Sequence, residues 1–183
     1  MKILSPVLMA AGLWPSMGCG MLGRESFEGQ PGWVLASDVS VVLQKGEEDC
    51  GAAALAMVLA SWGRPTSIEE IVAACPGSSS GIRAADLRDF AKREGMKAFL
   101  FSGTIEDLER ELAKRRPVVV GLLKGEDRSR VCHYEVVAGV NLERRQIALV
   151  DPARGWMRVD LDRFVSEWEP AGRLAMAVFR AGE

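Results

Sequence analysis

The longest regular pattern of apolar side chains in this chain begins at Cys50. Apolar residues recur there at the spacing of a well-buried helix, and Gly63, Arg64 and Pro65 interrupt the pattern. The apolar positions are Ala52, Ala53, Leu55, Ala56, Val58, Leu59 and Trp62. The pattern predicts a helix that starts near Cys50, directly after a polar turn at 44–49, and lies in the core.

Four shorter helices are expected on either side of the predicted strands. The segment 66–74 opens with a capping-box pattern, and 84–94 is amphipathic and ends before Gly95, a natural C-cap. Thr104 is the expected N-cap of 105–115, whose acidic residues come early and whose basic residues come late, as the helix dipole prefers. The segment 160–168 has the apolar spacing of a short helix.

Strands dominate the second half of the chain. Extended segments are predicted at 37–43, 96–101, 117–123, 132–140, 146–150, 156–159 and 174–179, and 141–145 is typical of a hairpin turn. The run 117–123 is apolar throughout, as for a strand covered on both faces. Helices followed by an antiparallel meander indicate an α+β fold, in which an N-terminal helical half packs on a C-terminal antiparallel β-sheet.

The N-terminus has the features of a targeting segment over residues 1–19. Lys2 precedes about a dozen mostly apolar residues, short of the ~20 that span a membrane. Ser16, Met17 and Gly18 then precede Cys19, as in a bacterial lipoprotein cleavage box. This interpretation makes Cys19 a lipidated N-terminus and anchors the protein to a membrane of the bacterial cell envelope. A secreted, periplasmic or cytosolic soluble protein is the alternative.

Domain boundaries follow from composition. Residues 20–36 are rich in glycine and charge and are expected to form a tether, which leaves a folded domain at 37–181. The net charge is −2, from 23 basic and 25 acidic residues mixed along the chain of 183. No basic block appears, so nucleic acid is not an expected partner.

The cysteines and the histidine limit the possible chemistry. The four cysteines match no zinc-binding pattern, and a single histidine does not complete a histidine-rich site. Neither a metal nor another cofactor is therefore expected. The sequence allows a disulfide between Cys75 and Cys132 but does not test it.

Cys50 is the candidate nucleophile. A cysteine in the first turn of a buried helix faces unpaired backbone N–H groups and the positive end of the helix dipole, and both favour the thiolate. The alternative is that Cys50 is simply a small buried residue at a helix start. Its polar, glycine-flanked context, Asp49 before it and Gly51 after it, favours the catalytic interpretation.

Three further residues complete the candidate site. His133 starts a strand in the other half of the domain, and Asp151 ends the next strand, roughly level with His133 when residues are counted back across the hairpin. Asp151 would then hold the second nitrogen of the imidazole. Gln44 lies six residues before Cys50, where its amide and the Cys50 N–H would form an oxyanion hole.

Three motifs occur in a fixed order: Q-x-x-x-x-D-C-G-x-A-x-L-A-M at 44–57, H-Y-x-V-V-x-G at 133–139 and D-P-x-x-G at 151–155. They resemble the papain-like double-glycine leader peptidases, a family of bacteriocin-processing cysteine peptidases often found at the N-terminus of peptide-exporting ABC transporters. The resemblance covers about 37–179. It implies a papain-like fold with Cys50 as nucleophile, His133 as general base, Asp151 as orienting residue and Gln44 as oxyanion donor.

The resulting hypothesis is a stand-alone cysteine endopeptidase that cleaves a peptide or protein substrate, including bonds after small residues such as Gly-Gly. No transmembrane or ATP-binding region is expected in this chain, in contrast to the transporter fusions of the family. Two alternatives use the same fold: an envelope-anchored module that binds peptides without cutting them, and a thiol acyl transferase or amidase. Peptidase and transferase share one acyl-enzyme and differ only in the acceptor.

Overall fold

The computed structural model describes residues 22–75, 77, 81–125 and 131–182. The segment 1–19, with Cys19, lies outside them, so its interpretation as a lipoprotein signal stays a prediction. Within the described ranges, no helix is long and apolar enough to cross a membrane.

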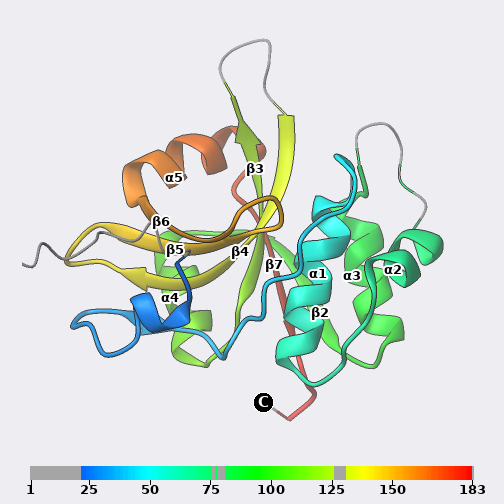
Figure 1. The fold of residues 1–183 in the computed structure, drawn as a ribbon, viewed down its shortest axis with the longest axis horizontal. Coiled ribbons are helices and arrows are strands. Elements are labelled where there is room, and N and C mark those ends of the chain that lie inside the picture. Colours follow the sequence, from blue (N-terminus) through cyan, green and yellow to red (C-terminus); the bar gives the residue numbers. More distant parts are fainter. Residues whose placement is uncertain (1–21, 76, 78–80, 126–130, 183) are drawn as a thin grey trace, which may run out of the picture.

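A seven-stranded antiparallel sheet forms the centre of the molecule (Figure 1). Its order is β2-β7-β3-β4-β5-β6, and the short β1 pairs with β4 beside this path. The strands are β1 (Val34–Leu35), β2 (Lys97–Ser102), β3 (Val118–Lys124), β4 (Val131–Asn141), β5 (Gln146–Asp151), β6 (Gly155–Asp160) and β7 (Leu174–Phe179). The meander β3 to β6 is the antiparallel sheet that the second half of the sequence predicts.

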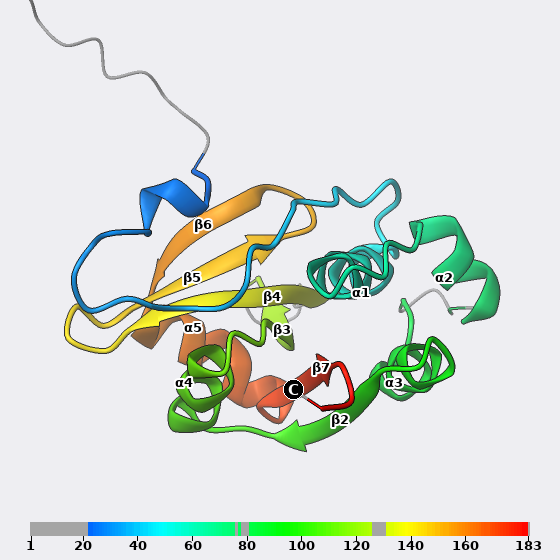
Figure 2. The same cartoon turned by 90° about the horizontal axis from the view of Figure 1, so that it is seen from below.

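Helices cover both faces of this sheet. Figures 1 and 2 show α1, α2 and α3 grouped on one side of the molecule and α4 and α5 at the other. Alternating strand residues fill the two cores: Val119 packs with α1 and α3, whereas its neighbours Val118 and Val120 pack with α4 and α5. The helices are α1 (Cys50–Ser61), α2 (Ile68–Ala74), α3 (Ala84–Arg93), α4 (Ile105–Ala113) and α5 (Leu161–Trp168), with short 3-10 turns at Arg24–Ser26 and Glu169–Ala171.

Helix α1 is the central helix that the apolar pattern predicts. Every residue from Cys50 to Leu59 is buried, so the helix is enclosed on all sides. Five alanines along it remove bulk and let β4 and α3 pack close to the helix backbone. The predicted capping residues are also confirmed, because the side chains of Ser67 and Thr104 accept hydrogen bonds from the third residue of α2 and α4.

The segment before residue 37 differs from the expected tether. Residues 22–36 pack against the sheet: Phe27 is fully buried, with its ring 4.9 Å from that of Trp33 and 5.5 Å from that of Trp156. The Asn141 side chain also donates a 3.0 Å hydrogen bond to the Pro31 carbonyl. Glycine and charge dominate the composition there, but Phe27 and Trp33 of the segment pack together, and Phe27 also packs on the distant Trp156. The extended segment predicted at 37–43 joins no sheet, and β1 lies just before it.

Substituting Phe27 tests whether this segment belongs to the folded body. Phe27→Ala leaves a cavity between two tryptophans and is expected to cost about 3 kcal/mol of unfolding free energy, measured by urea denaturation. Phe99→Ala is the matched control, because the Phe99 side chain is half exposed. If both variants lose the same small amount of unfolding free energy, the segment does not pack on the folded body, and the interpretation as a tether would hold.

Candidate active site

Cys50 is the first residue of α1 and lies against β4. The residue is only 5% exposed, and the imidazole of His133 lowers the pKa of its thiol. The following glycine makes this approach possible. A Cβ on Gly51 would lie 3.1 Å from the Tyr134 ring and 3.0 Å from Leu87, so a larger residue would push the helix start away from β4.

The start of α1 keeps its N–H groups uncapped by any side chain. Asp49 is the N-cap residue, but its carboxylate accepts a 2.8 Å hydrogen bond from the Gly46 N–H instead. The first N–H groups of a helix have no partner within the helix. The backbone N–H groups of Cys50 and Gly51 are therefore available to a negative charge that forms beside the sulfur.

His133 lies between Cys50 and Asp151. Its Nε2 is 2.7 Å from Asp151 Oδ1, which leaves Nδ1 as the nitrogen that faces the thiol. Asp151 is 2% exposed and also accepts a 2.8 Å hydrogen bond from the Ala153 N–H in the turn after β5. The structure thus brings together the three residues that the sequence predicts, in the order cysteine, imidazole, carboxylate.

The register between β4 and β5 corrects one detail of that prediction. Val136 pairs with Val150, and continuing this register places Asp151 opposite Glu135, two residues from His133. An extra residue in β4 between Val137 and Gly139 causes the shift. Without this bulge Asp151 would face Val136, on the other side of the sheet; with it, Asp151 shares a face with Glu135 and His133.

The pKa values of the pair move in the directions that an ion pair requires. Burial alone would raise the pKa of the Cys50 thiol, but the hydrogen bond with His133 and the N–H groups of Tyr134 and Gly51 bring it below its ordinary value. Burial alone would likewise lower the pKa of His133, yet Asp151 and Cys50 raise it to about 9. Asp151 is itself buried, and its bond to His133 holds its pKa below the usual range. Thiolate and imidazolium are therefore the favoured forms between the two pKa values.

Gln44 lies near the site but is otherwise engaged. Its side-chain Nε2 donates a 2.9 Å hydrogen bond to the Gly46 carbonyl, and its Oε1 is buried without a hydrogen-bond partner. Its backbone N–H bonds to the carbonyl of Pro152, 2.9 Å away, which ties the Gln44 turn to the turn that follows Asp151. The amide carries a second N–H, which bonds to no acceptor among the residues that the structure describes.

A second carboxylate beside His133, that of Glu135, was missed in the prediction from sequence. Glu135 is fully buried, with Oε1 at 3.9 Å from His133 Nε2 and 2.8 Å from Lys124 Nζ. Burial raises its pKa, and Lys124 opposes that shift. Lys124 also pairs with Glu167 of α5. Its place two residues after His133 on a strand was the available signal, because such residues share a face.

Three side chains of the site are grouped closely enough to suggest a metal site. Ligand atoms of His133, Glu135 and Asp151 lie within 4.8 Å of one another, a spacing that a metal site also uses. Hydrogen bonding between His133 and Asp151, and the ion pair of Glu135 with Lys124, account for this grouping without a metal. Cys75 and Cys132 are both free thiols, so the disulfide left open by the sequence is not formed.

A cysteine beside a histidine, at the start of a buried helix that packs on an antiparallel sheet, is the arrangement of a cysteine peptidase of papain-like fold. The chain belongs to the Peptidase C39 family, whose model matches residues 38–177. This assignment confirms the family resemblance of the sequence motifs.

Individual relatives agree with the family assignment. The chain is 28% identical to the peptidase domain of Streptococcus ComA, a bi-functional ABC transporter involved in quorum sensing; the match covers 76% of this chain and 96% of that domain, with a TM-score of 0.66. A putative C39-like peptidase from Bacillus anthracis has the same fold at 18% identity, with 82% and 99% covered and a TM-score of 0.71. The lactococcin-G-processing and transport ATP-binding protein LagD of Lactococcus lactis is 26% identical over 128 residues, 70% of this chain but 17% of LagD.

Glu135→Gln tests whether this buried carboxylate acts on the imidazole. The variant removes a negative charge 3.9 Å from His133 Nε2 and should lower the pKa of the imidazolium below about 9. We expect the alkaline inflection in the pH profile of Cys50 alkylation by iodoacetamide to move to lower pH. Glu167→Gln, which removes the other carboxylate partner of Lys124, is the control and should leave the inflection in place. An unchanged profile in Glu135→Gln would limit Glu135 to pairing with Lys124.

Proposed function

We propose that this protein is a cysteine endopeptidase in which Cys50 is the nucleophile and His133 the general acid and base. The observation that supports this most is the position of His133, whose Nε2 lies 2.7 Å from Asp151 Oδ1 and whose imidazole lowers the pKa of the Cys50 thiol. Asp151 fixes the orientation and tautomer of the ring, so that Nδ1 meets the sulfur.

The proposed reaction follows from these positions. The Cys50 thiolate attacks the carbonyl carbon of a peptide bond, and the carbonyl oxygen becomes an oxyanion beside the start of α1. The Cys50 backbone N–H and the side-chain amide of Gln44 donate hydrogen bonds to it. His133 gives its Nδ1 proton to the departing amine as the C–N bond breaks, which leaves a thioester on Cys50. The imidazole then takes a proton from water as the water oxygen attacks the thioester carbon; the C–S bond breaks, the carboxylic acid leaves and the Cys50 thiolate returns.

Peptides are the proposed substrate, with cleavage after small residues such as Gly-Gly. The chain spans about a sixth of LagD, so the processing and transport activity in that protein's name is carried to this chain only as a proposal about peptide cleavage. The family membership and the peptidase domain of ComA support it.

Digestion of a peptide library, followed by mass spectrometry, tests this function. Cys50→Ala and His133→Ala should abolish cleavage. Gln44→Ala should lower kcat by about 10²-fold with a smaller change in KM, because the oxyanion forms only in the transition state.

Gln30→Ala is the matched control, since the Gln30 amide also donates to a backbone carbonyl but lies outside the site. Cleavage that persists in Cys50→Ala would overturn the proposal. Transfer of the acyl group to an added amine in preference to water would identify a transferase on the same acyl-enzyme.

A further inference from the structure

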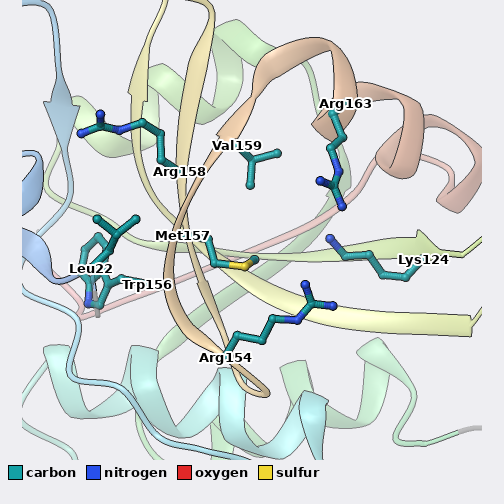
Figure 3. Close-up of a pocket in the computed structure, with 8 residues that line it drawn as sticks. All are labelled: Leu22, Lys124, Arg154, Trp156, Met157, Arg158, Val159 and Arg163. Carbon is teal, nitrogen blue, oxygen red and sulfur yellow. The ribbon is translucent and has the colours of Figure 1, made fainter. Parts of the chain in front are cut away.

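A basic pocket lies beside the candidate active site, on the α5 side of the sheet. It has a volume of about 280 Å³, and among the described residues that line it four are cationic and none is acidic. Figure 3 shows Lys124, Arg154 and Arg163 extending toward one another around Met157, and Arg158 across the β6 ribbon from them. These three cations come from β3, the turn between β5 and β6, and α5. The chain as a whole has a net charge of −2, so the pocket departs from the average surface.

The cations retain donors for a ligand. Arg163 Nε is 3.3 Å from Glu167 Oε1, and Arg154 Nε is 3.6 Å from Asp151 Oδ2, with the two arginine side chains 66% and 69% exposed. A guanidinium has five N–H donors in a planar fork that matches a carboxylate. One long contact at each Nε leaves the outer N–H groups of both arginines directed to solvent or to a ligand.

The pocket is linked directly to the residues that hold the imidazole. Arg154 contacts Asp151, and Lys124 pairs with Glu135, which lies beside His133. During cleavage the imidazolium protonates the amine of the leaving group, so that part of a substrate must pass the imidazole. Arg154 and Lys124 lie on the side of the imidazole opposite α1. They therefore border the part of the peptide that is C-terminal to the cleaved bond.

The edge of the sheet at this pocket suits an extended peptide. β6 is the last strand in the sheet order, and Leu22 already forms an antiparallel bridge with Trp156 at its outer edge. An extended chain therefore fits against this edge through its backbone. In the part of the chain that the structure describes, no strand pairs with the outer edge of β6 beyond that bridge.

We propose that this pocket binds an acidic side chain of the peptide substrate, on the C-terminal side of the cleaved bond. The inference rests on the proposed peptidase function. The carboxylate lies between Arg163 and Arg154, near Lys124, while apolar atoms of the same residue contact Met157. The site thus adds a preference for aspartate or glutamate to the small residues expected before the cut.

Cleavage specificity in a proteome-derived peptide library tests this proposal with the full chain. Wild-type protein should favour Asp or Glu at a fixed position after the cleaved bond. Arg163→Gln should lower kcat/KM for such peptides about threefold relative to their amide counterparts, the size of effect of one exposed ion pair. Arg163→Glu should turn the preference toward Lys or Arg.

Arg110→Gln is the matched control. Arg110 is 62% exposed and pairs with Asp107 three residues before it in α4, but it lies outside the pocket. The Arg110→Gln variant should show the same preference for acidic residues after the cleaved bond as wild type. The proposal would be overturned if wild-type protein shows no acidic preference, or prefers acidic residues on the N-terminal side of the cut. It would also be overturned if Arg163→Gln keeps the acidic preference of wild type.

A binding experiment separates this inference from the proposed function. Cys50→Ala protein is titrated with acetyl-Glu-Ala-Glu-amide and with acetyl-Gln-Ala-Gln-amide while arginine Nε–H signals are followed by NMR. Shifts of Arg163 and Arg154 with the acidic peptide alone support the site, even if wild-type protein cleaves nothing and the peptidase proposal fails. Equal responses to the two peptides overturn it.

Discussion

The arrangement depends on one contact, between a thiol at the first residue of α1 and an imidazole on β4. The two groups are more than eighty positions apart in the sequence and belong to opposite halves of the fold. Their approach is set by packing: α1 is buried from Cys50 to Leu59, and Gly51 lets its first turn rest on Tyr134 and Leu87. A helix anchored in the core therefore fixes the sulfur, and a strand in the centre of the sheet fixes the imidazole.

Burial by itself opposes charge on each member of the site. It raises the pKa of the Cys50 thiol and lowers that of His133, so neither would be charged alone. Their mutual hydrogen bond, the helix N–H groups and Asp151 reverse both tendencies. The carboxylates and cations beyond Asp151 extend this charged network to α5 through Lys124 and to the basic pocket through Arg154. Lys124 and Arg154 thus contact the carboxylates around the imidazole. They also line the pocket where we place the substrate residue on the C-terminal side of the cleaved bond.

Sequence reasoning predicted the parts of the fold that depend on local pattern. The start of α1 at Cys50, the caps at Ser67 and Thr104, and the meander of strands follow from spacing and from residue type. The proximity of Cys50, His133 and Asp151 was also predicted, although the bulge in β4 was not. An extra residue in a strand leaves no mark in the hydrophobic pattern when Val137, Ala138 and Gly139 are all small or apolar.

Features that depend on contacts between residues far apart in the sequence could not be predicted from the sequence alone. The segment around Phe27 has the composition of a tether, and its packing with Trp156 and the Asn141–Pro31 hydrogen bond make it part of the folded body. Glu135, as a single acidic residue in an apolar strand, gained meaning only with Lys124 beside it. The oxyanion role expected for Gln44 is equally a matter of side-chain orientation, since its amide is bonded to the Gly46 carbonyl.

The ion pair of Cys50 and His133 is the central claim, and NMR titration of the imidazole tests it most directly. His133 is the one histidine of the chain, so its signals are unambiguous. We predict that the imidazole titrates at a pKa of about 9 in the wild-type protein and at a lower value in Cys50→Ala, where the negative partner is absent. An imidazole that titrates near its ordinary value of about 6.5 in both proteins would contradict the account.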